Sequence, residues 1–122
     1  KVSNSGVVAT DTTGVGTARR FLAAAGYGTN KAIFGYGATA SYSSLTNKVS
    51  DSGVVATDTT GVGTARGALA AAGYGTNKAI FGYGTTGAYQ SITNKVSDSG
   101  VVATDTTGVG TARSEITAAS YG

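Results

Sequence analysis

The sequence lacks cysteine, histidine, proline, methionine and tryptophan altogether. Without cysteine there is no disulfide framework and no thiolate chemistry, and nothing indicates the redox compartment. Without histidine, Ser-His-Asp and Cys-His catalytic arrangements and histidine-based metal sites are excluded. No apolar run approaches the roughly 18 residues of a membrane span, and no signal peptide is visible. Because it starts at Lys1 and has no methionine, we expect the chain to be processed or to be an internal segment of a longer protein.

What the sequence does contain is one 47-residue unit written about two and a half times. The first copy covers residues 1–47, the second 48–94 and a truncated third 95–122, and together they form one continuous repeat domain. The first two copies are identical at 39 of 47 positions. Apart from Asn4 against Asp51, their differences fall in two clusters, one directly after Thr-Ala-Arg and the other directly after Gly-Tyr-Gly. A period of this length predicts a repeat architecture.

Charge is sparse and evenly spread. Nine basic and six acidic residues give a net charge of +3, which is about one positive charge for each repeat. Such a distribution indicates a solvated surface rather than the concentrated basic patch that binds nucleic acid. Neither a nucleic-acid partner nor insertion into a membrane is therefore expected.

Each unit reads as four short β-strands separated by turns. In the second copy the strands are expected at about residues 68–74, 78–83 and 91–97, with the outermost at 54–59. Glycine makes up 20 of the 122 residues, about twice the usual share of roughly 7%, and supplies the turns between them. The segment TARGALAAAG also fits a helix, with Thr64 as its N-cap and Gly73 just past its end. Gly67 inside that segment and the β-branched residues of the third copy favour a strand.

Four strands in a unit of 40–50 residues resemble a blade of a β-propeller. The unit resembles a kelch repeat in particular: Arg66 precedes a strand of small residues, KAIF precedes Gly-Tyr-Gly, and a variable loop leads to two outer strands. It departs from the kelch pattern where Tyr83 separates the paired glycines and VVATDT replaces the outer tryptophan. The arrays GVVATDTTGVGTAR and KAIFGYG are also similar to repeat proteins of phages that infect aquatic bacteria. The resemblance implies an all-β fold of four-stranded antiparallel blades in an extracellular or virion protein.

The number of predicted strands does not close a ring. The chain would hold about eleven strands, which is two and a half blades, whereas propellers close with 4–8. Open sheet faces and edges require a partner, because unpaired strands otherwise associate. We therefore expect a homo-oligomer, a filament built by head-to-tail contacts, or continuation in a longer array.

No feature of the sequence indicates an enzyme, a cofactor or a metal site. The single glutamate is Glu115, so paired carboxylates would have to come from aspartates that recur once in each copy. A residue repeated in every copy is better explained as a structural brace, with Asp58 pairing with Arg66 within a blade or between blades. The brace candidates are Asp11, Arg19, Asp58, Arg66, Asp105 and Arg113.

The two variable clusters are expected on one rim of the propeller, where loops carry binding residues over a fixed scaffold. The candidate ligand-binding residues are Arg20, Phe21, Tyr42, Tyr89 and Gln90. Their aromatic and amide groups suit a glycan or a protein, and neutral drift of surface loops is the alternative. The sequence thus predicts a non-enzymatic structural or adhesive protein of a virion appendage or extracellular fibre. The alternative is an engineered or recently amplified symmetric propeller that acts as a glycan-binding lectin.

Overall fold

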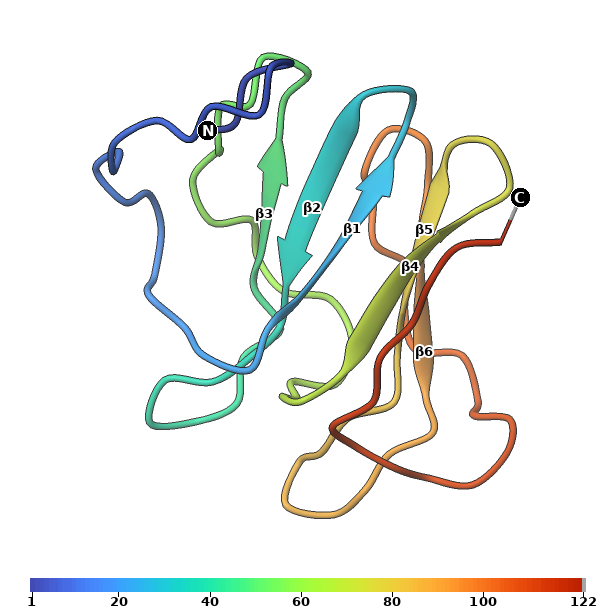
Figure 1. Cartoon of the computed structure of the whole chain (residues 1–122). Coiled ribbons are helices and arrows are strands. Elements are labelled where there is room, and N and C mark those ends of the chain that lie inside the picture. Colours follow the sequence, from blue (N-terminus) through green and yellow to red (C-terminus); the bar gives the residue numbers. More distant parts are fainter. Residues whose placement is uncertain (122) are drawn as a thin grey trace.

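The computed structural model describes residues 1–121 and shows an all-β chain (Figure 1). Its six strands are β1 (Ala23–Tyr27), β2 (Lys31–Gly35), β3 (Thr46–Val49), β4 (Ala70–Tyr74), β5 (Lys78–Gly82) and β6 (Thr93–Val96). They form two three-stranded antiparallel sheets, ordered β1-β2-β3 and β4-β5-β6. The predicted all-β class is confirmed. Within residues 1–121 no helix has the length and hydropathy needed to cross a membrane.

The two sheets have the same register, displaced by one sequence repeat. Ala25 pairs with Ile33 in the first sheet, and Ala72 pairs with Ile80 in the second. The connection from β1 to β2 turns at Gly28, whose φ of 58° lies in the left-handed region that glycine adopts without a steric penalty. Strand β3 crosses the boundary between the first two sequence copies, so the folded unit is offset from the sequence unit.

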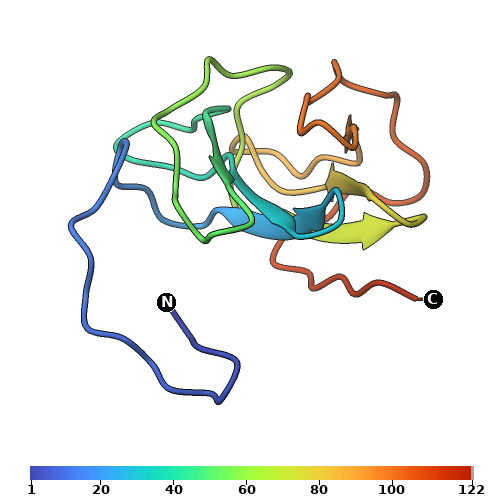
Figure 2. The same cartoon turned by 90° about the horizontal axis from the view of Figure 1, so that it is seen from above.

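The core lies between the two sheets, which stand side by side with β1 next to β4 (Figures 1 and 2). Ile33 and Tyr36 reach it from the first copy, and Ala79 and Phe81 from the second, all without solvent exposure. The rings of Tyr36 and Phe81 meet edge to face, with centroids 5.1 Å apart. This geometry contributes about 0.5–1.5 kcal/mol beyond the apolar area it buries. Each copy therefore buries its apolar face only by packing it against the apolar face of the next copy.

Gly35 makes this approach possible, because an added Cβ would stand 2.8 Å from Phe81 Cζ. We expect Gly35→Ala to reduce the free energy of unfolding by about 1–3 kcal/mol, since it forces the ring from its position. Gly82 occupies the same repeat position in the second sheet, where the nearest atom to an added Cβ is Thr93 Cγ2 at 3.4 Å. Gly82→Ala is the matched control, with an expected change of about 0.5 kcal/mol or less. Equal losses in urea titrations would contradict this assignment.

The predicted outermost strand at residues 54–59 is wrong as a continuous strand. The segment contacts β3 through two isolated bridges, Val49 with Val55 and Thr46 with Thr59. Between them the Asp58 side chain accepts hydrogen bonds from Thr17 and Asn47, and aspartate is itself disfavoured in strands. Each sheet consequently has three strands and a bridged outer segment instead of four strands.

The predicted total of about eleven strands is also wrong, because residues 1–121 form six. Before Arg19 there is one bridge, between Val2 and Val8, and residues 114–121 run without a ladder. A single strand or hairpin is marginal by itself, and neither end segment is paired to a sheet by a ladder of backbone hydrogen bonds. The helical alternative for TARGALAAAG is excluded, since β4 occupies its second half.

Identical backbone hydrogen bonds join each copy to the next. The N–H of Ala68 donates to the carbonyl of Phe21 at 2.9 Å, and the N–H of Glu115 donates to the carbonyl of Ala68 at 2.9 Å. An added Cβ at Gly73 would lie 3.4 Å from Gly26 O of the first copy and 3.2 Å from Ser120 Oγ of the third. The third copy therefore begins on the second sheet in the way that the second begins on the first.

Candidate functional site

A polar cluster connects the start of the first sheet to its outer segment. Arg19 donates from Nη2 to Asn47 Oδ1 at 2.6 Å and from Nη1 to Asp58 Oδ1 at 3.3 Å. Asp58 also accepts hydrogen bonds from the N–H and the hydroxyl of Thr17, at 2.9 and 2.7 Å. The amide of Asn47 donates to Asp58 at 2.8 Å and so links the two charged groups. We call these four residues the first clasp.

The second clasp consists of Thr64, Arg66, Asn94 and Asp105. Arg66 donates to Asn94 Oδ1 at 2.7 Å, and Asn94 donates to Asp105 Oδ1 at 2.8 Å. The Thr64 hydroxyl donates to Asp105 at 2.6 Å. Unlike Arg19, Arg66 also lies over the ring of Tyr36, which directly follows β2 of the preceding sheet, with its guanidinium carbon 4.4 Å from the ring centroid. The second clasp thus ties its own sheet together and fixes that sheet against the one before it.

The predicted pairing of Asp58 with Arg66 is wrong, because Asp58 pairs with Arg19. The arginine that opens a sheet and the aspartate that follows the last strand of the same sheet are 39 residues apart in sequence. Arg66 opens the next sheet, and its clasp uses Asp105 by way of Asn94.

The two remaining brace candidates, Arg113 and Asp11, each belong to an incomplete clasp within the described part of the chain: Arg113 lacks the aspartate, and Asp11 lacks the donors. Arg113 is exposed, lies 4.2 Å from the ring centroid of Tyr83 and donates to the carbonyl of Thr111. Asp11 is also exposed, on the N-terminal segment. No acidic side chain pairs with Arg113, and no basic one with Asp11, among residues 1–121.

The clasps shift the acid–base properties of their members. Hydrogen bonds from the Thr17 hydroxyl and the Asn47 amide lower the pKa of Asp58 to about 2 from 3.8. Burial would raise the pKa of Asp105, but the hydrogen bonds from Thr64 and Asn94 outweigh it and hold that pKa below its ordinary value. Both aspartates are therefore ionised in the folded chain at neutral pH.

Burial is the main cause of the pKa shifts of Arg66 and Tyr36, which lie between the sheets. It lowers the pKa of the Arg66 guanidinium, which nevertheless remains charged at neutral pH. It raises the pKa of Tyr36 to about 12, so the hydroxyl stays protonated and donates to the carbonyl of Val62 at 3.0 Å.

We expect stability to fall in acid because of these aspartates. A carboxylate whose pKa is lower in the folded state contributes stability above its unfolded pKa, and this contribution is lost as pH falls through the folded pKa. For Asp58 that window runs from about pH 4 down to about pH 2. Urea midpoints followed by tyrosine fluorescence should drop in this range. Asp58→Asn should show a shallower drop, with Asp98→Asn as the control for loss of one charge outside the clasps. Parallel profiles for wild type and Asp58→Asn would refute the role of the carboxylate.

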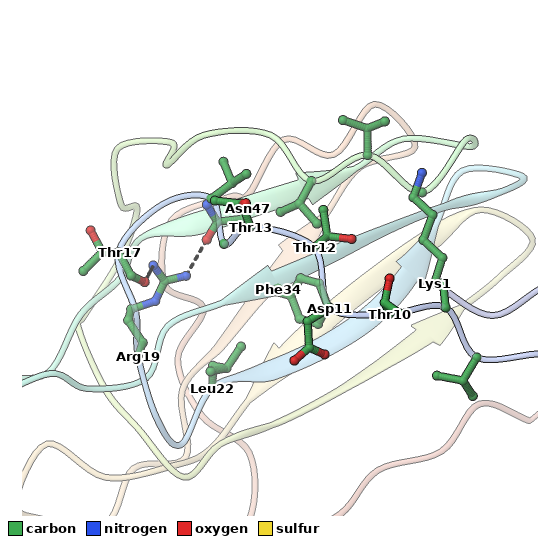
Figure 3. A pocket seen from close by; sticks show the side chains of 17 residues that line it. Lys1, Thr10, Asp11, Thr12, Thr13, Thr17, Arg19, Leu22, Phe34 and Asn47 are labelled. Carbon is green, nitrogen blue, oxygen red and sulfur yellow. Dashed lines mark hydrogen bonds between the residues drawn. The ribbon is translucent and has the colours of Figure 1, made fainter.

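A groove of about 670 Å³ lies between the N-terminal segment and the first sheet (Figure 3). Leu22 and Phe34 line it from the sheet, and Asp11 lines it from the N-terminal segment. Arg19 and Asn47 of the first clasp line its end. Strand β2 directs Ile33 toward the core, so its neighbour Phe34 faces this groove.

The two outer faces of the molecule are unlike, and each reproduces one side of the internal interface. Phe81 is fully buried against the first sheet, whereas Phe34, at the same repeat position, is 37% exposed in the groove. Conversely, Tyr36 is fully buried, whereas Tyr83, its equivalent, is only partly covered. One end of the chain therefore presents an aromatic side chain without its receiving surface, and the other presents the receiving surface without that side chain.

The variable clusters lie together at one end of the sheets. The N–H of Arg20 donates to the carbonyl of Ala38 at 2.9 Å, which places the two clusters of the first copy side by side. The Arg20 guanidinium carbon is 5.1 Å from the ring centroid of Phe21. An added Cβ at Gly67 would be 3.3 Å from Tyr42 and 3.5 Å from Phe21. The structure thus gathers Arg20, Phe21 and Tyr42 into a first rim group.

The candidates of the second copy form a separate group at the same end of the molecule, where both long loops project in Figure 1. Tyr89 is 67% exposed. The Gln90 amide is engaged within its own loop, donating to the Thr86 hydroxyl and to the carbonyl of Ala88, each at 3.1 Å. Gln90 therefore shapes its loop and is less available to a ligand than Tyr89.

Reasoning from the sequence missed Asn47, Asn94, Tyr36 and Phe34. The asparagines link Arg to Asp, Tyr36 contacts Phe81 of the next copy, and Phe34 lines the groove. A detectable signal existed, because each stands at a fixed distance from the clasp arginine in both complete copies. Among residues 1–121 no three His, Cys, Asp or Glu side chains are grouped as metal ligands. No protein-family model matches the sequence, and a search of curated proteins finds no significant similarity.

Proposed function

We propose that the chain is a non-enzymatic structural or adhesive repeat protein that assembles with copies of itself, as a component of a virion appendage or an extracellular fibre. The sheets, each with its bridged outer segment, act as blades of an incomplete kelch-like propeller. Copies join head to tail through their two unlike outer faces.

One observation carries this proposal, namely the contrast between Phe34 and Phe81. The same residue at the same repeat position is buried inside the chain and exposed at its end. Burying a phenylalanine side chain contributes about 1.5–3 kcal/mol. An exposed aromatic beside an apolar groove marks an interaction site. A contact between two different faces generates rings or filaments.

The test is the mass of the particle as a function of concentration, with no ligand added. We expect light scattering to show growth with concentration and negative-stain images to show rings or filaments. Phe34→Glu should abolish growth without unfolding the chain, because this side chain lies outside the core. Val7→Glu, another exposed apolar position, is the control and should assemble normally. A wild-type chain that stays monomeric at all concentrations would refute the proposal.

Glycan binding is a second candidate function, favoured by the first rim group. Phe21 is 58% exposed and lies beside Arg20 and Tyr42, and an aromatic face with polar neighbours suits the apolar face of a sugar. A glycan array should then show binding that Phe21→Ala with Tyr42→Ala removes. Retention of binding by this double variant would exclude the rim group as the site.

A further inference from the structure

The geometry points to a third clasp that forms between molecules: Thr111 and Arg113 of one copy bind Asp11 of a second copy, and residues 114–121 of the first enter the groove of the second. This inference rests on the proposed self-assembly and specifies the contact that directs it. The partner is a second copy of this chain.

The two complete clasps show which partner is missing from each half-clasp, that is, from Thr111 with Arg113 at one end and from Asp11 at the other. In both, a threonine N–H and hydroxyl donate to an aspartate 41 residues further along the chain. Thr111 and Arg113 repeat the donor half with the same local sequence, Gly-Thr-Ala-Arg. Asp11 repeats the acceptor half within Ala-Thr-Asp-Thr. Donor and acceptor therefore stand at opposite ends of one chain, and the charges of the two halves are complementary.

Gly110 shows that the donor half is already arranged to receive a carboxylate. Its φ of 82° matches the 76° of Gly63. In the second clasp, an added Cβ at Gly63 would collide with the Asp105 carboxylate and stand 2.6 Å from the Asn94 amide. At Gly110 the nearest atom is Tyr83 Oη at 3.8 Å, so the same backbone surrounds open space. Arg113 is stacked on Tyr83 as Arg66 is stacked on Tyr36, with its guanidinium held in place.

The groove shows where the rest of the contact lies. Asp11 lines it together with Leu22 and Phe34. Inside the chain, the segment that follows each Thr-Ala-Arg packs against the equivalent segment of the neighbouring copy, as Gly26, Gly73 and Ser120 do in succession. The groove is the corresponding place beside β1. Residues 114–121 follow Arg113 directly, so binding of Arg113 at Asp11 brings them to this groove.

The test compares matched variants of the full chain by sedimentation over a range of concentrations. Asp11→Asn should weaken association about tenfold or more, because it leaves a charged donor without its partner. Gly110→Ala should do the same, since its Cβ would occupy the place of the incoming carboxylate. The controls are Asp98→Asn for charge and Gly75→Ala, which also has a positive φ and nothing within 4 Å of an added Cβ. Urea titration should show all four variants folded.

Charge reversal supplies a second readout. Asp11→Arg and Arg113→Asp should each be monomeric alone and should assemble when mixed, because the mixture restores opposite charges at every junction. Assembly of wild type with unchanged affinity in Asp11→Asn and Gly110→Ala would overturn the clasp and leave self-assembly standing. A wild-type chain that never associates would overturn both.

Discussion

Replacing Phe81 with alanine is expected to lower the free energy of unfolding by about 3–5 kcal/mol. The side chain is fully buried, meets Tyr36 edge to face and fills the space above Gly35. Its removal leaves a cavity between the sheets and exposes apolar surface on both. Native proteins have roughly 5–15 kcal/mol in total, so the expected loss is a large fraction of the stability of the chain. Because the chain has no tryptophan, the transition should be followed by tyrosine fluorescence and circular dichroism.

Phe34→Ala is the matched control for Phe81→Ala. The two residues occupy the same repeat position in the equivalent strands β2 and β5 and have the same local sequence, but they differ in solvent exposure. Phe34→Ala should cost the isolated chain about 1 kcal/mol or less, while weakening its assembly. Equal destabilisation of the monomer by both changes would show that the core does not lie between the sheets.

Replacing Arg66 with alanine should also cost about 3–5 kcal/mol. The guanidinium is fully buried and donates to the carbonyls of Tyr83 and Thr64 and to the side chain of Asn94. Removing it leaves these acceptors unpaired, withdraws the cation from the ring of Tyr36 and opens a cavity. Chemical denaturation of the full chain measures the loss.

Arg66→Lys and Arg113→Ala are the two comparisons for Arg66→Ala. Lysine keeps the charge but cannot form the planar fork, so we expect about half or more of the loss to remain. Arg113 is exposed and has one hydrogen bond to its own segment, so Arg113→Ala should change the free energy of unfolding by less than about 1 kcal/mol. A large loss at Arg113 in the monomer would mean that its half-clasp is already occupied within the chain.

The sequence predicted the β-class and the three inner strands of each copy because their signals are local. KAIFG and AAAGY are short runs of apolar and small residues bounded by turn residues. The outer segment was predicted wrongly because its conformation is set by a distant partner. Whether Asp58 sits in a ladder or bends inward depends on Thr17, 41 residues away, and local propensity carries no information about that contact.

The site was predicted in its composition but not in its connections. The recurrence of Arg and Asp once per copy suggested a brace, yet a repeat offers two aspartates to each arginine, one before it and one after. Asn47 decides between them, since it lies beside Arg19 and Asp58 and donates to the latter. The unequal exposure of Phe34 and Phe81 could not be predicted from the repeat, because the two residues have identical neighbours in sequence.

The backbone bonds from copy to copy have one further consequence. Phe21, Ala68 and Glu115 hold the same left-handed conformation, with φ of 57°, 51° and 56°, although their side chains have nothing in common. Main-chain groups make the hydrogen bonds between them, so one backbone conformation accommodates an aromatic, a small and an acidic side chain at this position. A long array of such units could therefore carry a different side chain at this position in every unit.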